Sequence, residues 1–225
     1  MKRITVLLAE DHMIVREGLR RLLEAEDDLE VVGEAQTGRE AVKMTGKLRP
    51  AVVVMDIAMP LLNGLEATRQ ILQTIPATKV LILSAHSDDA YVEGATGSGA
   101  TGFLLKQTSA HVLAEAIREV EKGNTFFSPS ISKHLQNQHR KSPDGEERLK
   151  NQSPRLSSRE MEVLQLIAEG KANKATAAEL RISIKTVEKH RQRLMQKLDI
   201  HDTAGLTRYA IAAGIIAGPV QLTIV

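Results

Sequence analysis

Residues 51–56, Ala51-Val52-Val53-Val54-Met55-Asp56, form an apolar run without polar alternation that ends in a carboxylate. Such a run is typical of a central parallel strand that helices cover on both faces. Four similar short runs occur within residues 1–127, at Ile4–Ala9, Val31–Ala35, Lys79–Ser84 and Gly102–Leu105. Segments with a helical spacing of apolar residues separate them. This repeated strand–helix alternation predicts an α/β doubly wound, five-stranded parallel sheet.

The C-terminal part of the chain has a different pattern. Residues 128–153 are rich in Ser, Pro, Asn, Gln and charge, which predicts a polar linker. Residues 154–219 are expected to form a small all-α domain of four helices. These helices are expected from Ser157 or Ser158 to Gly170, at Asn173–Leu180, from Ser183 to Leu198, and from Asp202 or Thr203 to Gly214.

Composition excludes several classes of protein. The 225 residues contain no cysteine, which rules out disulfides, thiolate metal sites and cysteine nucleophiles. The apolar runs near the N-terminus and at Ala210–Ala217 are too short for a secretion signal or a membrane span, so we expect a cytoplasmic protein without membrane contact.

Charge is unevenly distributed along the chain. Residues 1–127 contain 14 Lys and Arg against 18 Asp and Glu, whereas residues 154–225 contain 11 against 7. A basic C-terminal part favours nucleic acid as a partner, and a solvated basic surface is the simpler alternative.

Polar side chains follow four of the predicted strands. Glu10 and Asp11 follow the first strand, Asp56 ends the third, Ser84 ends the fourth and Lys106 follows the fifth. In doubly wound sheets the functional crevice lies at the carboxyl ends of the strands. Three carboxylates repel one another unless a cation neutralises them, and oxygen ligands without Cys or His suit Mg²⁺. The hydroxyl and the ammonium group suit a bound anion. The alternative is that the acids only cap the following helices.

The sequences LLAEDHMIVREGL, VVVMDIAMPLLNGLEA, VLILSAH and GATGFLLK contain these polar residues. They resemble the receiver domain of bacterial two-component response regulators, which has a flavodoxin-like fold. The resemblance implies that Asp56 attacks the phosphohistidine of a sensor histidine kinase and becomes an aspartyl phosphate. It also implies Mg²⁺ ligation by Asp11, Asp56 and the backbone carbonyl of Ala58, with Glu10 acting partly through water.

The same resemblance assigns three further residues. Lys106 is expected to pair with the phosphoryl group and Ser84 to donate a hydrogen bond to it. Phe103 occupies the position of an aromatic switch residue. As a Phe it has no phenolic hydroxyl, and an ordinary core aromatic is the alternative reading.

The third helix of the C-terminal part has two chemically different sides. Its apolar side consists of Ile184, Val187, Leu194 and Leu198, and its opposite side consists of Lys185, Lys189, Gln192 and Gln196. A short helix, a turn and a helix with such an outer side predict a helix-turn-helix. Lys and Gln can contact phosphates and base edges, and a solvated surface helix is the alternative.

Residues 156–214 resemble the LuxR-type four-helix DNA-binding domain, and a receiver joined to this domain defines the NarL/FixJ family. The resemblance implies double-stranded DNA as a partner, read by Glu188, Lys189 and Gln192. Phosphate contacts are expected from Lys185, Thr186, His190 and Arg193. The chain departs from the family at Lys174–Ala177, where the family has an acid and then a large aliphatic, so Thr176 is expected to thin the core.

These features together predict a response regulator in which phosphorylation controls homodimer formation and sequence-specific DNA binding, and thereby transcription. The dimer contact is expected on the final helix near Leu206 and Tyr209. One alternative is a phosphatase or phosphotransferase that uses Asp56 for turnover, but Ala58 stands where such enzymes have a second acid. We therefore expect no enzyme activity beyond slow self-dephosphorylation. The other alternative is a module that dimerises without DNA or phosphate. The apolar tail at residues 219–225 has no functional interpretation.

Overall fold

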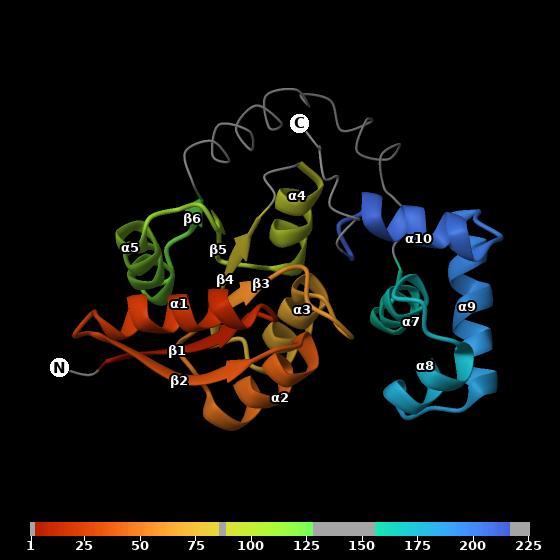
Figure 1. The fold of residues 1–225 in the computed structure, drawn as a ribbon, viewed down its shortest axis with the longest axis horizontal. Coiled ribbons are helices and arrows are strands. Elements are labelled where there is room, and N and C mark those ends of the chain that lie inside the picture. Colours follow the sequence, from red (N-terminus) through yellow and green to blue (C-terminus); the bar gives the residue numbers. More distant parts are fainter. Residues whose placement is uncertain (1–2, 86–88, 128–155, 217–225) are drawn as a thin grey trace. The chain divides into compact units, whose positions relative to one another are not determined.

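The computed structural model describes residues 3–85, 89–127 and 156–216 (Figure 1). The chain divides into two compact units, Met1–Arg155 and Leu156–Val225. The predicted linker at residues 128–153 and the tail at residues 219–225 lie outside the described residues. Within the described residues, no helix has the length and apolar content needed to cross a membrane.

The first unit contains a parallel sheet of six strands in the order β2-β1-β3-β4-β5-β6. The strands are β1 (Ile4–Ala9), β2 (Leu29–Ala35), β3 (Val52–Asp56), β4 (Lys79–Ser84), β5 (Gly102–Leu105) and β6 (Phe126–Phe127). The doubly wound α/β class and its first five strands are confirmed, but the expected total of five is wrong. The sixth strand pairs with β5 over only two residues, too few for a periodic sequence signal.

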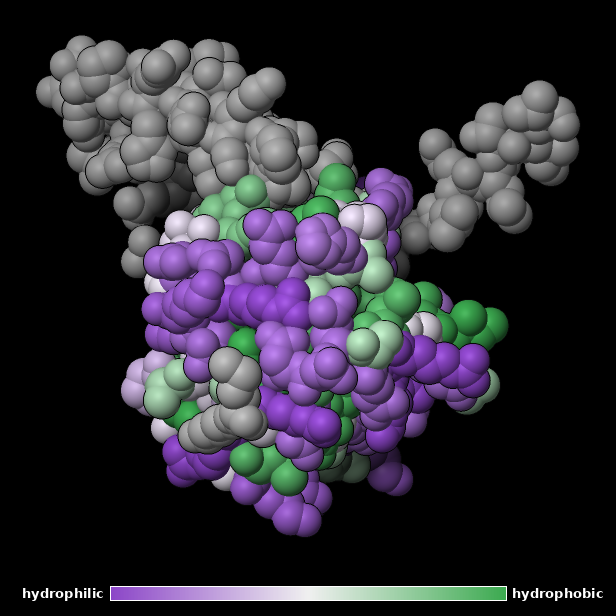
Figure 2. All heavy atoms as spheres, turned by 90° about the vertical axis from the view of Figure 1, so that its left-hand side faces the viewer, coloured by the Kyte–Doolittle hydropathy of each residue, from purple (hydrophilic) through white to green (hydrophobic). Residues whose placement is uncertain are grey.

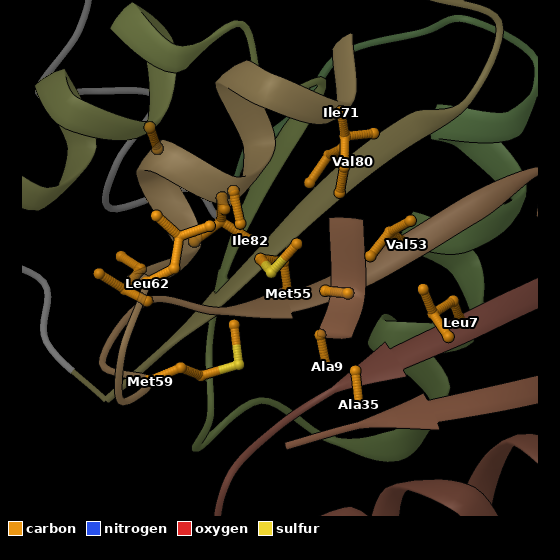
Figure 3. Close-up of a cluster of buried hydrophobic side chains, with 14 of the residues drawn as sticks. Leu7, Ala9, Ala35, Val53, Met55, Met59, Leu62, Ile71, Val80 and Ile82 are labelled. Atoms are coloured by element: carbon orange, nitrogen blue, oxygen red, sulfur yellow. The ribbon is translucent and has the colours of Figure 1, made fainter. Parts of the chain in front are cut away.

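Helices cover both faces of this sheet. They are α1 (Met13–Glu24), α2 (Gly38–Leu48), α3 (Gly64–Thr74), α4 (Asp89–Ser98) and α5 (Ala110–Glu121). Because successive strand residues point to opposite faces, Val53 and Met55 join one buried cluster and Val52 and Val54 join the other. Figure 3 shows the first cluster, which includes residues of α2, α3 and α4. The second cluster includes residues of α1 and α5.

One glycine of α4, Gly94, lies against a side chain of the neighbouring helix. Three glycines in or just after this segment predict a short or frayed helix, and α4 is the shortest of α1 to α5, with ten residues. A Cβ atom on Gly94 would lie 2.7 Å from Leu65 Cδ1 of α3. Glycine at this position therefore leaves room for the Leu65 side chain, at the expense of helix propensity.

The second unit contains α7 (Ser158–Ala168), α8 (Asn173–Leu180), α9 (Ile184–Leu198) and α10 (Thr203–Ala212). The side chains of Ser157, Ser183 and Asp202 each accept a hydrogen bond from a backbone N–H in the first turn of the helix that follows. These three caps set the starts of α7, α9 and α10, as the sequence predicts. At the start of α7, Glu160 completes a capping box, and its carboxylate lies 2.7 Å from Lys197 Nζ of α9.

On the predicted apolar side of α9, Val187 and Leu194 are buried, and Ile184, in the first turn of the helix, is 44% exposed. One expectation for this unit needs correction. Leu206 is fully buried in the core of its own unit, so its side chain is not available at a dimer surface. Tyr209, which was expected beside it, is half-buried.

Thr176 occupies a position in α8 that suits an apolar residue. Its side chain is fully buried, and its hydroxyl has no hydrogen-bond partner within the described part of the chain. A buried hydroxyl without a partner has lost its hydration without compensation.

We predict that Thr176→Val stabilises the second unit by about 1 kcal/mol, because valine keeps the shape and removes the unpaired hydroxyl. Thr207→Val is the matched control, since the Thr207 hydroxyl donates to the Thr203 carbonyl at 3.0 Å and should give no such gain. Calorimetry of the full chain measures both variants. Equal or lower stability of Thr176→Val would contradict the assignment of an unpaired hydroxyl.

Candidate functional site

The carboxyl ends of β1, β3, β4 and β5, which are neighbours in the sheet, bring the sequence-predicted polar residues to one edge. Glu10 and Asp11 follow β1, Asp56 ends β3, Ser84 ends β4 and Lys106 follows β5. We call these five residues the rim cluster. Ser84 is buried, and its carbonyl accepts a hydrogen bond from the Lys106 backbone N–H at 2.7 Å.

Lys106 joins two carboxylates of the rim cluster. Its Nζ lies 2.7 Å from Glu10 Oε2 and 3.1 Å from Asp56 Oδ2, and the side chains of Glu10 and Asp56 are 2% and 4% exposed. Burial lowers the pKa of Lys106, but the charges of Asp56 and Glu10 outweigh burial and the net shift is upward. The ammonium group therefore stays charged and neutralises part of the carboxylate charge.

The Asp56 carboxyl is harder to ionise in this arrangement than an aspartate in water. Burial raises the pKa of Asp56 above its ordinary value, the charge of Glu10 raises it further, and Lys106 opposes both effects. One oxygen, Oδ1, is held by the backbone N–H of Ile57 at 2.8 Å. The other faces Lys106, so each oxygen of this carboxylate has a contact.

The loop after Asp56 depends on a glycine. A Cβ atom on Gly64, the first residue of α3, would lie 1.9 Å from the Asp56 carbonyl oxygen, so no larger residue fits there. The Gly64 N–H donates to the Ile57 carbonyl at 2.9 Å, and Asn63 caps α3. Ala58 lies half-buried in this loop, two residues beyond Asp56.

Phe103 lies in the hydrophobic core. Its side chain is fully buried in the first cluster, and the residue pairs with Ile82 of β4 and Phe127 of β6. This placement agrees with the alternative reading as a core aromatic and does not test the switch role.

Arg16, which has no signal in the sequence, organises the loop between β1 and α1. Its guanidinium donates to the Glu10 carbonyl at 2.8 Å and the Asp11 carbonyl at 3.4 Å, and its Nε lies 2.9 Å from Glu34 Oε2. Arg16 is only 6% exposed. Nothing in a single sequence distinguishes it from Arg20 and Arg21 on the same helix.

Four residues at this edge could hold a metal ion. One ligand atom from each of Glu10, Asp11, His12 and Asp56 lies within 4.8 Å of the others. Their carboxylate oxygens are donors that hard divalent cations prefer. The side-chain ligands predicted from the sequence are all carboxylates, so His12 is an addition from the structure.

The second unit presents most of its predicted DNA contacts on α9. Lys185, Glu188, Lys189, Gln192 and Arg193 are exposed there. Thr186 and His190, in contrast, are half-buried and not fully exposed. The Thr186 hydroxyl lies 2.8 Å from that of the capping residue Ser183, and His190 Nδ1 is buried without a partner in the described segments. These two side chains are therefore less open to a ligand.

Arg191 has no signal in the sequence and connects α9 to two other helices. Its guanidinium donates to Thr203 Oγ1 at the start of α10 at 2.7 Å and to Asn173 Oδ1 at the start of α8 at 3.4 Å. It thus ties three helices together beside the exposed side of α9. A shallow groove next to it is lined by Glu188, Gln192 and His201.

Comparison with known proteins matches both units. The family model for the response regulator receiver domain matches residues 6–118, and the model for bacterial regulatory proteins of the luxR family matches residues 154–210. Transcriptional regulatory protein LiaR of Bacillus subtilis is 41% identical over 207 residues, covering 92% of this chain and 96% of LiaR. Response regulator protein VraR of Staphylococcus aureus is 36% identical over 213 residues, which cover 95% of this chain and 99% of VraR.

Solved structures agree with this result. RcsB of Salmonella typhimurium, described in terms of conformational dynamism for DNA interaction, has a TM-score of 0.63 at 28% identity and covers 95% of this chain and 99% of its own. RcsB bound to promoter rprA in the presence of phosphomimetic BeF₃⁻ has a TM-score of 0.60 at 26% identity. The match covers 92% of this chain and 98% of that RcsB chain. The chain therefore belongs to the NarL/FixJ family of response regulators and is a transcription regulator with a receiver domain and a LuxR-type DNA-binding domain.

Proposed function

We propose that Asp56 accepts a phosphoryl group from a sensor histidine kinase and that its phosphorylation controls homodimer formation and DNA binding. The observation that carries this proposal is the pairing of Lys106 with both Glu10 and Asp56 at the rim cluster. A cation already lies beside the proposed nucleophile, where an incoming phosphoryl group needs its charge neutralised. The receiver domain is assigned to residues 1–127, the linker to residues 128–153 and the DNA-binding domain to residues 154–219. Because the proposed target is DNA, we assign this regulator to the cytoplasm.

The proposed transfer forms one bond and breaks one bond. An Asp56 carboxylate oxygen attacks the phosphorus atom of the kinase phosphohistidine, a P–O bond forms, and the P–N bond breaks with its electron pair returning to the imidazole. Lys106 then pairs with phosphoryl oxygens, and the Ser84 hydroxyl donates to them. Phe103 is proposed to respond as the aromatic switch residue from its position next to β4.

Magnesium fits the donor set of this edge. Asp11, Asp56 and the backbone carbonyl of Ala58 would hold Mg²⁺, with Glu10 acting partly through water. When bound, the ion neutralises charge on the phosphoryl oxygens. The rim cluster supports this assignment because it has three carboxylates, and Lys106, the one ammonium group paired with them among the described residues, contacts only Glu10 and Asp56.

Turnover as a phosphatase is disfavoured by the loop after Asp56. Ala58, two residues beyond the proposed nucleophile, has no acidic group that could protonate a leaving group or activate water. We therefore assign Asp56 a regulatory modification with slow self-dephosphorylation.

We predict that Asp56→Asn abolishes phosphorylation by acetyl phosphate with Mg²⁺, because an amide is a poor nucleophile and a weaker metal ligand. Intact-protein mass spectrometry measures the gain of one phosphoryl group. Asp27→Asn is the matched control, since Asp27 is exposed and lies away from the rim. The unmodified chain and the control should gain the group, together with a higher dimer fraction and a higher DNA affinity. A phosphoryl gain on Asp56→Asn would refute the assignment.

The exposed side of α9 is proposed to enter the major groove of DNA. Glu188, Lys189 and Gln192 are assigned to base edges, and Lys185, Thr186, His190 and Arg193 to phosphates. The exposed side chains of Lys185, Glu188, Lys189, Gln192 and Arg193 support the assignments, and the half-buried Thr186 and His190 support them less. Arg191 supports them indirectly because it holds α9 against α8 and α10.

We predict that Lys189→Ala weakens binding to the preferred site by about 1–3 kcal/mol and changes sequence preference. In contrast, Lys185→Ala should weaken all sequences alike and lower the slope of log affinity against log salt by about one. Lys47→Ala in α2 removes the same charge from the receiver and serves as control. Fluorescence anisotropy with several duplexes at several salt concentrations separates these effects. Identical behaviour of the two α9 variants would contradict the division into base and phosphate contacts.

A further inference from the structure

His12 occupies a helix-capping position without capping the helix. It is the N-cap residue of α1, where Ser, Thr, Asp and Asn are the favourable residues, and its side chain makes no capping hydrogen bond. The ring instead lies against the rim cluster. Its Nδ1 is 2.8 Å from Asp11 Oδ1 and 3.2 Å from Glu10 Oε1.

The backbone holds His12 in this place. Its N–H donates to Glu10 Oε1 at 3.2 Å, and Arg16 binds the carbonyls of the two preceding residues. The side chain is 68% exposed, so the ring can turn without disturbing the core. The arrangement therefore combines a fixed main chain with a side chain that can change its partner from a carboxylate to a metal ion.

An imidazole nitrogen changes which cations such a site prefers. Carboxylate oxygens alone suit Mg²⁺, which prefers oxygen ligands and retains several waters. Imidazole suits borderline ions such as Ni²⁺ and Zn²⁺, whose affinities for nitrogen-containing sites exceed that of Mn²⁺. Glu10, Asp11, His12 and Asp56 each place one ligand atom within 4.8 Å of the other three.

We propose that His12 is a metal ligand of the rim cluster and gives this site a higher affinity for borderline transition-metal ions than its carboxylates alone would. This inference rests on the metal site of the proposed function and extends it to a second class of cation. Such an ion would compete with Mg²⁺ for Asp11 and Asp56. The receiver would then respond to the divalent metal present as well as to its kinase.

A simpler role for His12 makes a different prediction. If the ring only donates a hydrogen bond to Asp11, then glutamine can replace it, because its amide also donates. Glutamine is neutral and is a much poorer ligand than imidazole for Ni²⁺. His12→Gln therefore separates ligation from hydrogen bonding.

Isothermal titration of the full chain with Ni²⁺, and separately with Mg²⁺, tests the proposal. The chain has seven histidines, and the others can also bind Ni²⁺. Ni²⁺ binding is therefore assigned to the rim site only where the Asp11→Asn variant loses it and excess Mg²⁺ suppresses it. His12→Gln should weaken this part roughly tenfold or more, since even outer-shell partners of metal ligands contribute that much. It should leave Mg²⁺ binding unchanged, which also shows that the variant is folded.

His111→Gln is the matched control, because His111 is exposed near the start of α5 and should bind both ions as the unmodified chain does. Unchanged Ni²⁺ binding by His12→Gln would overturn the proposal, as would an equal loss of Ni²⁺ and Mg²⁺. If the Asp11→Asn variant binds Ni²⁺ and Mg²⁺ as tightly as the unmodified chain does, then the metal site of the proposed function is itself wrong.

Discussion

The contact of one ammonium group with two buried carboxylates is the interaction on which the receiver site depends. Lys106 follows β5 and reaches Asp56 at the end of β3 and Glu10 after β1, across the intervening strand β4, so the contact forms only when these four strands are in register. Asp11 adds a third carboxylate at the same edge. The three acids exceed the single ammonium in charge, and the surplus suits a divalent cation.

The surrounding structure holds the three carboxylates of the rim cluster together despite their mutual repulsion. Arg16 anchors the carbonyls of Glu10 and Asp11, while Gly64 lets α3 begin directly against the Asp56 carbonyl. The two hydrophobic clusters cover the sheet on both faces, and Figure 2 shows that hydrophilic side chains cover most of one outer face of the molecule. Packing energy from the core thus supports a local charge excess that would not form alone.

The parts of the structure that could be predicted from the sequence are those with a local signal. The run Val52–Asp56 indicates a buried strand by itself, and Ser157, Ser183 and Asp202 indicate helix starts by their capping chemistry. Because parallel strands end at one edge, the strand pattern also places the rim cluster. Strand β6 is too short to have a pattern. Arg16, Arg191 and His12 act through contacts that only the folded chain creates, so their residue types alone did not reveal them.

The most direct measurement of the surplus negative charge is the urea unfolding of the chain and of Asp56→Asn without metal, at several pH values. The raised pKa of Asp56 means that its ionised form is less stable in the folded than in the unfolded chain. At pH 7, the Asp56→Asn variant should therefore unfold at a higher urea concentration than the unmodified chain. Lys106 can still pair with Glu10 in this variant. This difference in stability between the variant and the unmodified chain should disappear as pH decreases toward the ordinary Asp pKa of about 3.9, because the Asp56 carboxyl then becomes neutral. A variant that is equally stable or less stable at pH 7 would contradict the charge surplus.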